Sequence, residues 1–348
     1  MDGQDICIWH RVRRTLGFSQ ADWGFNPGAR SASQSGILTL QVELFVKKFK
    51  WKAKSEAAHY RYLTKAGVPT PRSYGTIQHT DGDEILFLEW LTVIGYDRHS
   101  ESEWRELLSL LSLLARYNAC HVPLEAVSHL YPFEQGGKVG GWWITGFSEF
   151  PPTSDEIEKN LRVCGVADGE LATLGSAAQD LCRRVDALPK GLLHQDFLPD
   201  NFGWRGERES LVVFDVHKNC LGPRFADAAP YLGLPDWSNT ADFLDELPVD
   251  ELPVDELPVD EQPFDEQPVG EASVHDLPDR RKRLTQYYLD EYARFGGEQV
   301  SIETFQEEAS LLFWTHKVAV LWWLTEQNDT PHIGKILDYL RYYAASSP

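Results

Sequence analysis

The chain has 348 residues, of which 42% are hydrophobic and 25% charged, which is enough apolar sequence for a sizeable core in two or three lobes. The net charge of −20 argues against a nucleic-acid-binding surface, which would be basic, and no apolar stretch suits a secretory signal or a membrane span. The five cysteines form no CxxC pair, which argues against a disulfide framework or a zinc site and favours a reducing cytoplasm.

The first ninety residues are rich in β-forming sequence. Strands are predicted at Gly36–Val42, Leu44–Phe49 and Glu84–Leu91, where apolar residues alternate or run together. A helix is predicted at Ala53–Ala66, because apolar residues recur on one face and Gly67 follows as a stop signal. We expect residues 1–91 to form a small, strand-rich N-terminal lobe.

Beyond residue 100 the apolar residues recur with helical spacing. Helices are predicted at Trp104–Asn118, Leu171–Val185, Leu284–Phe295 and Phe305–Trp323. The expected architecture is therefore α+β and bilobal, with a larger, mainly helical lobe over residues 92–348.

An acidic insertion interrupts this second lobe at about residues 242–279. It holds 14 of the 53 acidic residues and no Lys or Arg, so the remainder of the chain is only mildly acidic. Residues 245–269 are five copies of a pentapeptide, DELPV or DEQP(V/F), in which every fifth residue is proline. Repeated prolines block a helix and adjacent acids repel one another, so we expect a mobile, extended segment. An acidic docking arm for a basic partner is the alternative.

The chemistry gathers in a polar loop between two apolar runs. His194-Gln-Asp196-Phe-Leu-Pro-Asp-Asn201 follows Leu192–Leu193, and the apolar run Ser210–Phe214 leads to Asp215. This order resembles the aminoglycoside phosphotransferase and choline kinase family, which has a protein kinase-like fold. That family's catalytic loop reads HxDxxxxN, and its metal-binding aspartate follows on the next strand. Gly222-Pro-Arg-Phe-Ala-Asp227 resembles the family's G-P-x-x-x-D segment.

The resemblance implies a role for each of these residues. Asp196 would take the proton of an acceptor hydroxyl, and Asn201 and Asp215 would bind Mg²⁺ through oxygen atoms. His194 would brace the loop rather than react, and Asp227 would hold the loop backbone. The sequence departs from the family pattern at Gln195, where glycine is usual, and at His217.

The N-terminal lobe supplies candidate nucleotide-binding residues. Lys47 lies on a predicted strand and Glu56 on the next helix, which resembles the kinase pair in which a lysine reaches the α- and β-phosphates. Lys48 points to the opposite face of the strand, so only one of the two lysines faces the nucleotide, and Lys47 is preferred.

Two further segments complete the expected nucleotide site. No GxGxxG sequence is present, so Ser31, Ser33 and nearby amides are candidates to cover the phosphates, although this segment also suits an ordinary surface turn. Backbone groups of Glu89 and Leu91 are expected to face the adenine.

The expected function is transfer of the γ-phosphate of ATP or GTP to a hydroxyl of a small molecule. A metal-dependent phosphoesterase is an alternative, because His194, Asp196, Asp215 and His217 include metal-ligand types, but the GD and GNH segments of such enzymes do not follow. A non-catalytic nucleotide-binding protein acting through its acidic repeat is another. Nothing in the sequence indicates a membrane partner or an oligomeric state.

The acceptor is expected to be cationic or polyhydroxylated. A mildly acidic body with a strongly acidic insertion would attract cations. The candidate residues on that side of the large lobe are Asp200, Asp236, Glu326, Trp322 and Trp323. The tryptophans could offer a π-face to an amine, although at helical spacing they also fit a helical core.

Overall fold

The computed structural model describes residues 34–39, 43–49, 56–78, 84–93, 104–128, 130, 150–197, 201–205, 210–229, 231–232 and 277–346. Several predicted features lie outside these ranges, namely Ser31, Ser33, Asp200, Asp236 and the acidic insertion as far as residue 276; the last three residues of the insertion, 277–279, begin helix α9 (Leu277–Arg294). The side chains of Trp322 and Trp323 are likewise outside the description.

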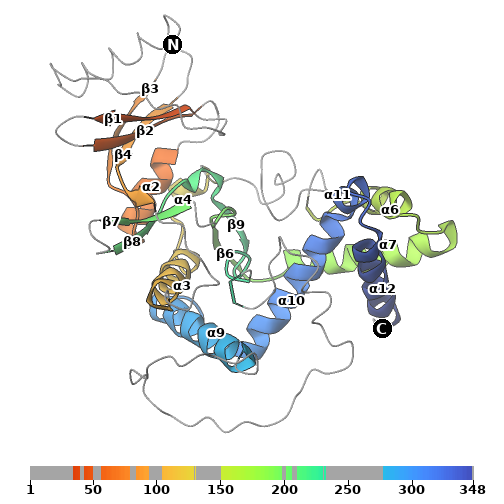
Figure 1. The fold of residues 1–348 in the computed structure, drawn as a ribbon. Helices are drawn as coiled ribbons and strands as arrows, with labels where there is room; N and C mark the ends of the chain where they lie inside the picture. Colours follow the sequence, from red (N-terminus) through yellow and green to blue (C-terminus); the bar gives the residue numbers. More distant parts are fainter. Residues whose placement is uncertain are drawn as a thin grey trace, which may run out of the picture.

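A four-stranded antiparallel sheet forms the N-terminal part of the molecule (Figure 1). Its strand order is β1 (Gln34–Thr39), β2 (Glu43–Phe49), β4 (Glu84–Glu89) and β3 (Ser73–Gln78). Between β2 and β3 the chain forms α2 (Glu56–Lys65), whose inner face is buried. The register sets Lys47 opposite Leu86 in the centre of the sheet, which places its side chain on a protected face.

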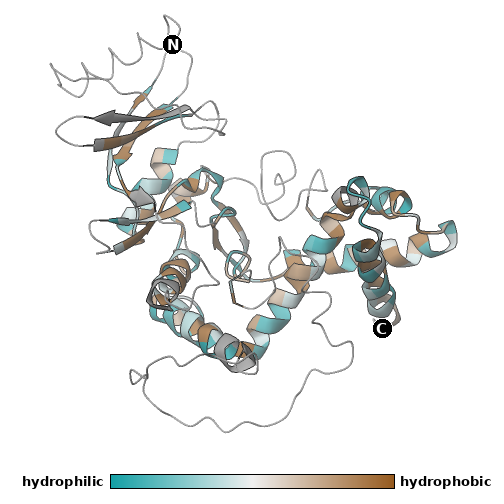
Figure 2. Ribbon diagram, in the orientation of Figure 1, coloured by the Kyte–Doolittle hydropathy of each residue, from teal (hydrophilic) through white to brown (hydrophobic). Residues whose placement is uncertain are grey.

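The remainder of the described chain is mainly helical (Figure 1). Its helices are α3 (Trp104–Asn118), α4 (Leu124–Val127), α6 (Ser154–Val163), α7 (Asp168–Asp186), α9 (Leu277–Arg294), α10 (Ile302–Ala319), α11 (Leu321–Glu326) and α12 (Thr330–Ser346). Helix α3 packs on α9, and α7 packs against α6, α10 and α12. Brown and teal segments alternate along these helices in Figure 2, as expected for helices with one apolar face.

Two small sheets carry the residues of interest. The first has the order β5 (Thr92–Val93), β7 (Phe202–Arg205), β8 (Ser210–Val213), and the second pairs β6 (Lys190–Leu193) with β9 (Cys220–Pro223). A short 3₁₀ helix, η4 (Val216–Lys218), connects β8 to β9. The polar loop that follows β6 therefore lies beside the turn that follows β8.

One buried apolar cluster joins the two parts of the fold. It includes Ala57, Tyr60 and Leu63 of α2 together with residues of α3, α7, α9 and α10. Helix α2 thus contributes to the same core as the C-terminal helices, although it lies within the sequence of the predicted N-terminal lobe.

The predicted order of a strand-rich N-terminal part followed by a mainly helical part is confirmed, with differences in detail. Helix α3 has the predicted bounds, but the single helix predicted over Phe305–Trp323 ends at Ala319, and α11 begins at Leu321. The break falls at Val320, whose ψ of 2° leaves the helical region. Helices α6 and α12 were not predicted.

The described part of the chain contains neither a membrane-spanning helix nor a disulfide. No helix there is both long and apolar enough to cross a bilayer. Cys120, Cys164, Cys182 and Cys220 all carry free thiols.

Candidate active site

The loop after β6 is held in place by Asp227. Its carboxylate accepts hydrogen bonds from the backbone N–H groups of His194, at 2.6 Å, and Gln195, at 3.1 Å. Burial raises the pKa of Asp227 to about 7, against the opposing effect of these two donors. Asp227 thus binds the backbone at the start of the loop through both carboxylate oxygens.

The imidazole of His194 braces the loop from inside. Its Nε2–H donates to the carbonyl of Phe214 at 2.8 Å, and its ring lies against Tyr117 and Phe197. Burial lowers the pKa of His194 to about 4, so the ring is neutral near pH 7. A neutral, fully enclosed ring suits a bracing role rather than proton transfer.

Asp196 and Asn201 lie together because the loop closes on itself. The side-chain amide of Asn201 donates to the backbone carbonyl of Asp196 at 2.6 Å. The Asp196 side chain is 17% exposed, and its Oδ2 accepts a hydrogen bond from the Lys218 ammonium at 2.7 Å. One end of the loop thus presents a carboxylate that is partly open to solvent.

Asp215 lies next to Asn201, at the turn between β8 and η4. The backbone N–H of Phe214 donates to the Asn201 carbonyl at 2.9 Å, which ties the two segments together. Asp215 has a φ of +61°, a left-handed conformation that turns the chain out of the strand. Of the apolar run Ser210–Phe214 that leads to Asp215, the first four residues form strand β8, which ends at Val213.

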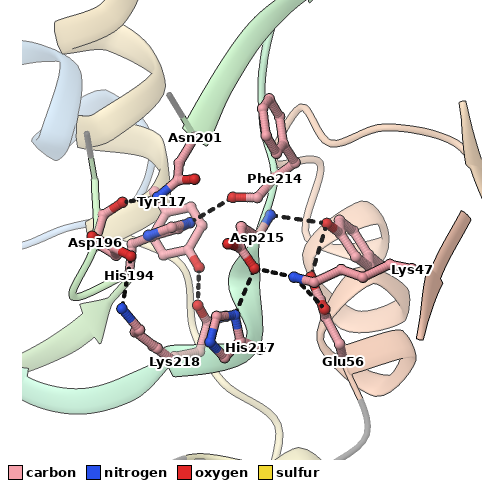
Figure 3. A network of polar contacts seen from close by, with 12 residues as sticks. Lys47, Glu56, Tyr117, His194, Asp196, Asn201, Phe214, Asp215, His217 and Lys218 are labelled. Carbon is pink, nitrogen blue, oxygen red and sulfur yellow. Dashed lines mark hydrogen bonds and ion pairs between the residues drawn. The ribbon is translucent and has the colours of Figure 1, made fainter. Parts of the chain in front are cut away.

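Lys47 connects Asp215 to α2 (Figure 3). Its ammonium lies 3.2 Å from the carboxylate of Glu56 and contacts the carboxylate of Asp215. The Tyr60 hydroxyl donates to Glu56 at 3.2 Å and accepts from the Asp215 N–H at 3.1 Å. The lysine, its glutamate and the metal-ligand candidate therefore form one contiguous cluster.

The opposite charges of Lys47 and Asp215 shift the pKa of each group so that its charged form is favoured. Burial by itself lowers the pKa of Lys47, but the carboxylates of Glu56 and Asp215 outweigh it and raise that pKa above its ordinary value. Burial alone would raise the pKa of Asp215, yet the Lys47 charge and a hydrogen bond from His217 Nδ1, at 2.6 Å, hold it well below its usual range. Both groups are charged near neutral pH.

The donor atoms fit a small divalent cation. The Asp215 carboxylate and the Asn201 amide are oxygen ligands of the type Mg²⁺ prefers, and the Asn201 carbonyl accepts a hydrogen bond from the N–H of Phe214, the residue before Asp215. Glu56, Asp215 and His217 also each offer a ligand atom within 4.8 Å of the others. By the role that the family resemblance implies, Asn201 and Asp215 are the residues that would hold the magnesium ion, while Glu56 would keep its ion pair with Lys47.

The remaining nucleotide-site candidates lie at the end of β4. The Glu89 side chain binds the guanidinium of Arg205 and the backbone N–H of Arg72, each at 3.0 Å. Its own N–H donates to the Arg72 carbonyl, so the N–H of Glu89 is already used within the fold. Leu91 follows and is buried. The adenine contacts expected of these two residues stay a prediction.

Four residues of the site region were missed from the sequence: Tyr60, Arg205, Lys218 and Arg224. Each acts through contacts with residues far away in the chain, and no local pattern marks any of them.

Comparisons with known proteins agree with this geometry. A profile described as the phosphotransferase enzyme family matches residues 43–253. A search of curated proteins finds no significant match.

The fold also matches solved structures, at low sequence identity. One is the amicoumacin kinase hAmiN in complex with AMP-PNP, Ca²⁺ and Ami, with a TM-score of 0.52 and 10% identity over 100% of this chain and 97% of that chain. Another is the GDP complex of aminoglycoside 2'-phosphotransferase-IIIa, with a TM-score of 0.50 and 11% identity over 98% of each chain.

These likenesses confirm the protein kinase-like fold. The family match spans more than half of the chain and contains Lys47, Glu56 and the whole His194–Asp227 region. The family match also argues against the alternative function, that of a metal-dependent phosphoesterase. The chain belongs to the phosphotransferase enzyme family and is a small-molecule kinase.

Proposed function

We propose that this kinase transfers the γ-phosphate of ATP or GTP, bound with Mg²⁺, to a hydroxyl group of a small molecule, with Asp196 as the proton acceptor. The observation that carries the proposal is the convergence of the Lys47–Glu56 pair, Asp215, Asn201 and Asp196 from segments far apart in the sequence.

Each residue has a distinct task in this reaction. Lys47, fixed by Glu56 and Asp215, would bind the α- and β-phosphates of the donor. Asn201 and Asp215 would hold the magnesium ion, which neutralises phosphate charge when bound. Asp196 would orient the acceptor hydroxyl and take its proton. Since phosphoryl transfer needs little covalent participation from the protein, positioning and charge carry most of the catalysis.

The acceptor is proposed to be cationic or polyhydroxylated. The chain is acidic overall, and the solved structures similar to it include kinases of aminoglycoside and amicoumacin substrates. Of the acidic candidates, Glu326 is exposed on α11, which packs against α6 and α12. The carboxylate of Asp196 is already paired with Lys218. The attraction proposed for a cationic acceptor would therefore act at the entrance of the site and not at Asp196.

A panel of acceptors tests both the proposed kinase reaction and the proposed class of acceptor. Release of ADP or GDP would be measured with MgATP or MgGTP and kanamycin, choline, ethanolamine, homoserine or glucose, for the wild type and for Asp196→Asn. We expect acceptor-dependent release that the variant largely loses, and a KM that rises with salt for a cationic acceptor. An anionic compound as the best acceptor would refute the acceptor class, whereas failure to bind either nucleotide would refute the kinase proposal itself.

A further inference from the structure

The proton-accepting carboxylate has a fixed cationic neighbour. The ammonium of Lys218 lies 2.7 Å from Oδ2 of Asp196, and the two side chains are 18% and 17% exposed. The loop from His194 to Asn201 contains no Lys or Arg of its own. Figure 3 shows the pair on the side of Asp196 away from Asn201, and Lys47 beyond Asp215. The two lysines thus lie at opposite ends of the site.

Lys218 is held by its backbone as well as by its charge. Its carbonyl accepts a hydrogen bond from the side-chain amide of Gln195 at 3.0 Å. The next residue, Asn219, is fully buried, donates to the Tyr62 hydroxyl at 2.9 Å and accepts from the Tyr117 hydroxyl. These contacts leave the base of the Lys218 side chain little freedom.

Gln195 occupies a backbone position that favours glycine. Its φ is +63°, in the left-handed region, where a residue with a Cβ is disfavoured by roughly 1 kcal/mol. Its N–H nevertheless donates to Asp227, and its side chain is buried against Lys218. Glycine would meet the conformational demand without strain but could not reach the Lys218 carbonyl. The glutamine side chain therefore supplies a hydrogen bond to the Lys218 carbonyl that glycine could not make.

We propose that Gln195 and Lys218 are positioning residues for the phosphoryl-transfer step: Gln195 fixes Lys218, and Lys218 fixes the carboxylate of Asp196. With Oδ2 bound to the ammonium, Oδ1 is left to meet the acceptor hydroxyl. This inference rests on the proposed function, because it assigns the orientation of the residue that accepts the proton.

The orientation of Asp196 matters in the step that transfers the phosphoryl group. The oxygen of the acceptor hydroxyl forms a bond to the γ-phosphorus, and its proton moves to Oδ1 of Asp196. The bond from the γ-phosphorus to the bridging oxygen breaks, and its electron pair leaves with the nucleoside diphosphate. Because the transition state is loose, the gain lies in alignment of the hydroxyl rather than in the basicity of the carboxylate.

Four variants and one control test the pair. Lys218→Met removes the ammonium, Lys218→Arg keeps a cation, Gln195→Gly removes the tether, and Gln195→Gly/Lys218→Met combines two changes. Lys190→Met is the control, because Lys190 also binds an aspartate, Asp186, at 3.0 Å but on the surface. Turnover is measured with the best acceptor of the panel, AMP-PNP affinity by calorimetry, and melting temperature by scanning calorimetry.

Lys218→Met should lower kcat on the order of 10- to 100-fold, as expected when a reacting group is misplaced by about 1 Å, with AMP-PNP affinity unchanged. Lys218→Arg should restore much of the loss. Gln195→Gly should lower kcat several-fold without lowering the melting temperature, and it should have no further effect in the Lys218→Met background. Lys190→Met should behave like the wild type.

The outcomes separate this inference from the proposed function. If the wild type releases no nucleoside diphosphate with any acceptor, the proposed function fails and the positioning pair fails with it. If the wild type is active and Lys218→Met keeps its kcat, or if the effects of Gln195→Gly and Lys218→Met multiply independently, the pairing alone is overturned. Loss of folding in Lys218→Met would leave the decision to Gln195→Gly, where an unchanged kcat would equally refute the pairing.

Discussion

Replacement of Arg224 tests whether a buried ion pair anchors the segment that carries Asp227. The Arg224 guanidinium binds Glu308 of α10 in a bidentate manner, through Nε at 3.2 Å and Nη2 at 2.6 Å. The two side chains are only 5% and 7% exposed. Arg224→Met removes the cation and leaves a carboxylate buried without its partner. Breaking such a pair on one side costs about 3–5 kcal/mol of unfolding free energy.

Smaller contacts of Arg224 change this magnitude little. Its bond to Glu298 at 2.7 Å involves a carboxylate that is 72% exposed, so solvent screens it. Its stacking over the Phe225 ring, at 4.8 Å, contributes about 0.5–1 kcal/mol. The loss should therefore be dominated by Glu308.

Urea unfolding followed by circular dichroism measures the effect. The double variant Arg224→Met/Glu308→Met should recover most of the lost stability, because no unpaired charge remains. Arg341→Met is the matched control, since Arg341 binds Glu170 with the same two-pronged geometry on the surface, and it should unfold like the wild type. If Arg224→Met costs less than about 1 kcal/mol, or if Arg341→Met costs as much, burial is not what makes the Arg224 pair matter.

Further predictions concern Asp196, Asp215 and the pentapeptide repeat. Asp196→Asn should keep nucleotide affinity near the wild-type value and lower turnover by about 10²- to 10⁴-fold, as steady-state kinetics and calorimetry would show; a variant with nearly normal kcat would remove Asp196 from its role. Asp215→Ala should weaken Mg²⁺-dependent ATP or GTP binding in calorimetry, and undiminished binding would contradict its assignment as a ligand. Replacement of residues 245–269 by a short Gly/Ser linker should leave melting temperature and kcat unchanged, and a loss of several degrees would show that the repeat packs on the body.

Local pattern was sufficient for much of the fold. The helix at Trp104–Asn118 has the bounds that its apolar period predicts, and β2 carries Lys47 as expected. The spacing of His194, Asp196 and Asn201 likewise indicated a loop that closes on itself, which the Asn201–Asp196 hydrogen bond shows. In these cases the information lies within one short stretch of sequence.

Features that depend on distant partners could not be predicted. Nothing near Lys218 shows that its ammonium binds Asp196, 22 residues earlier. The break at Val320 contains no proline or glycine, so the apolar period continued through it. The departure at Gln195 was visible in the sequence, but its positive φ and its bond to the Lys218 carbonyl were not.

The packing of α2 has a consequence for how the chain folds during synthesis. The Tyr60 hydroxyl reaches the backbone of Asp215, 155 residues further along the chain, and Tyr62 reaches Asn219. At a synthesis rate of about 5–20 residues per second, these partners emerge roughly 8–30 s after α2 itself. Until then the apolar face of α2 lacks much of its cover and is open to a holding chaperone. The N-terminal sheet can pair its strands early, whereas the nucleotide site is completed only after the catalytic loop has left the ribosome.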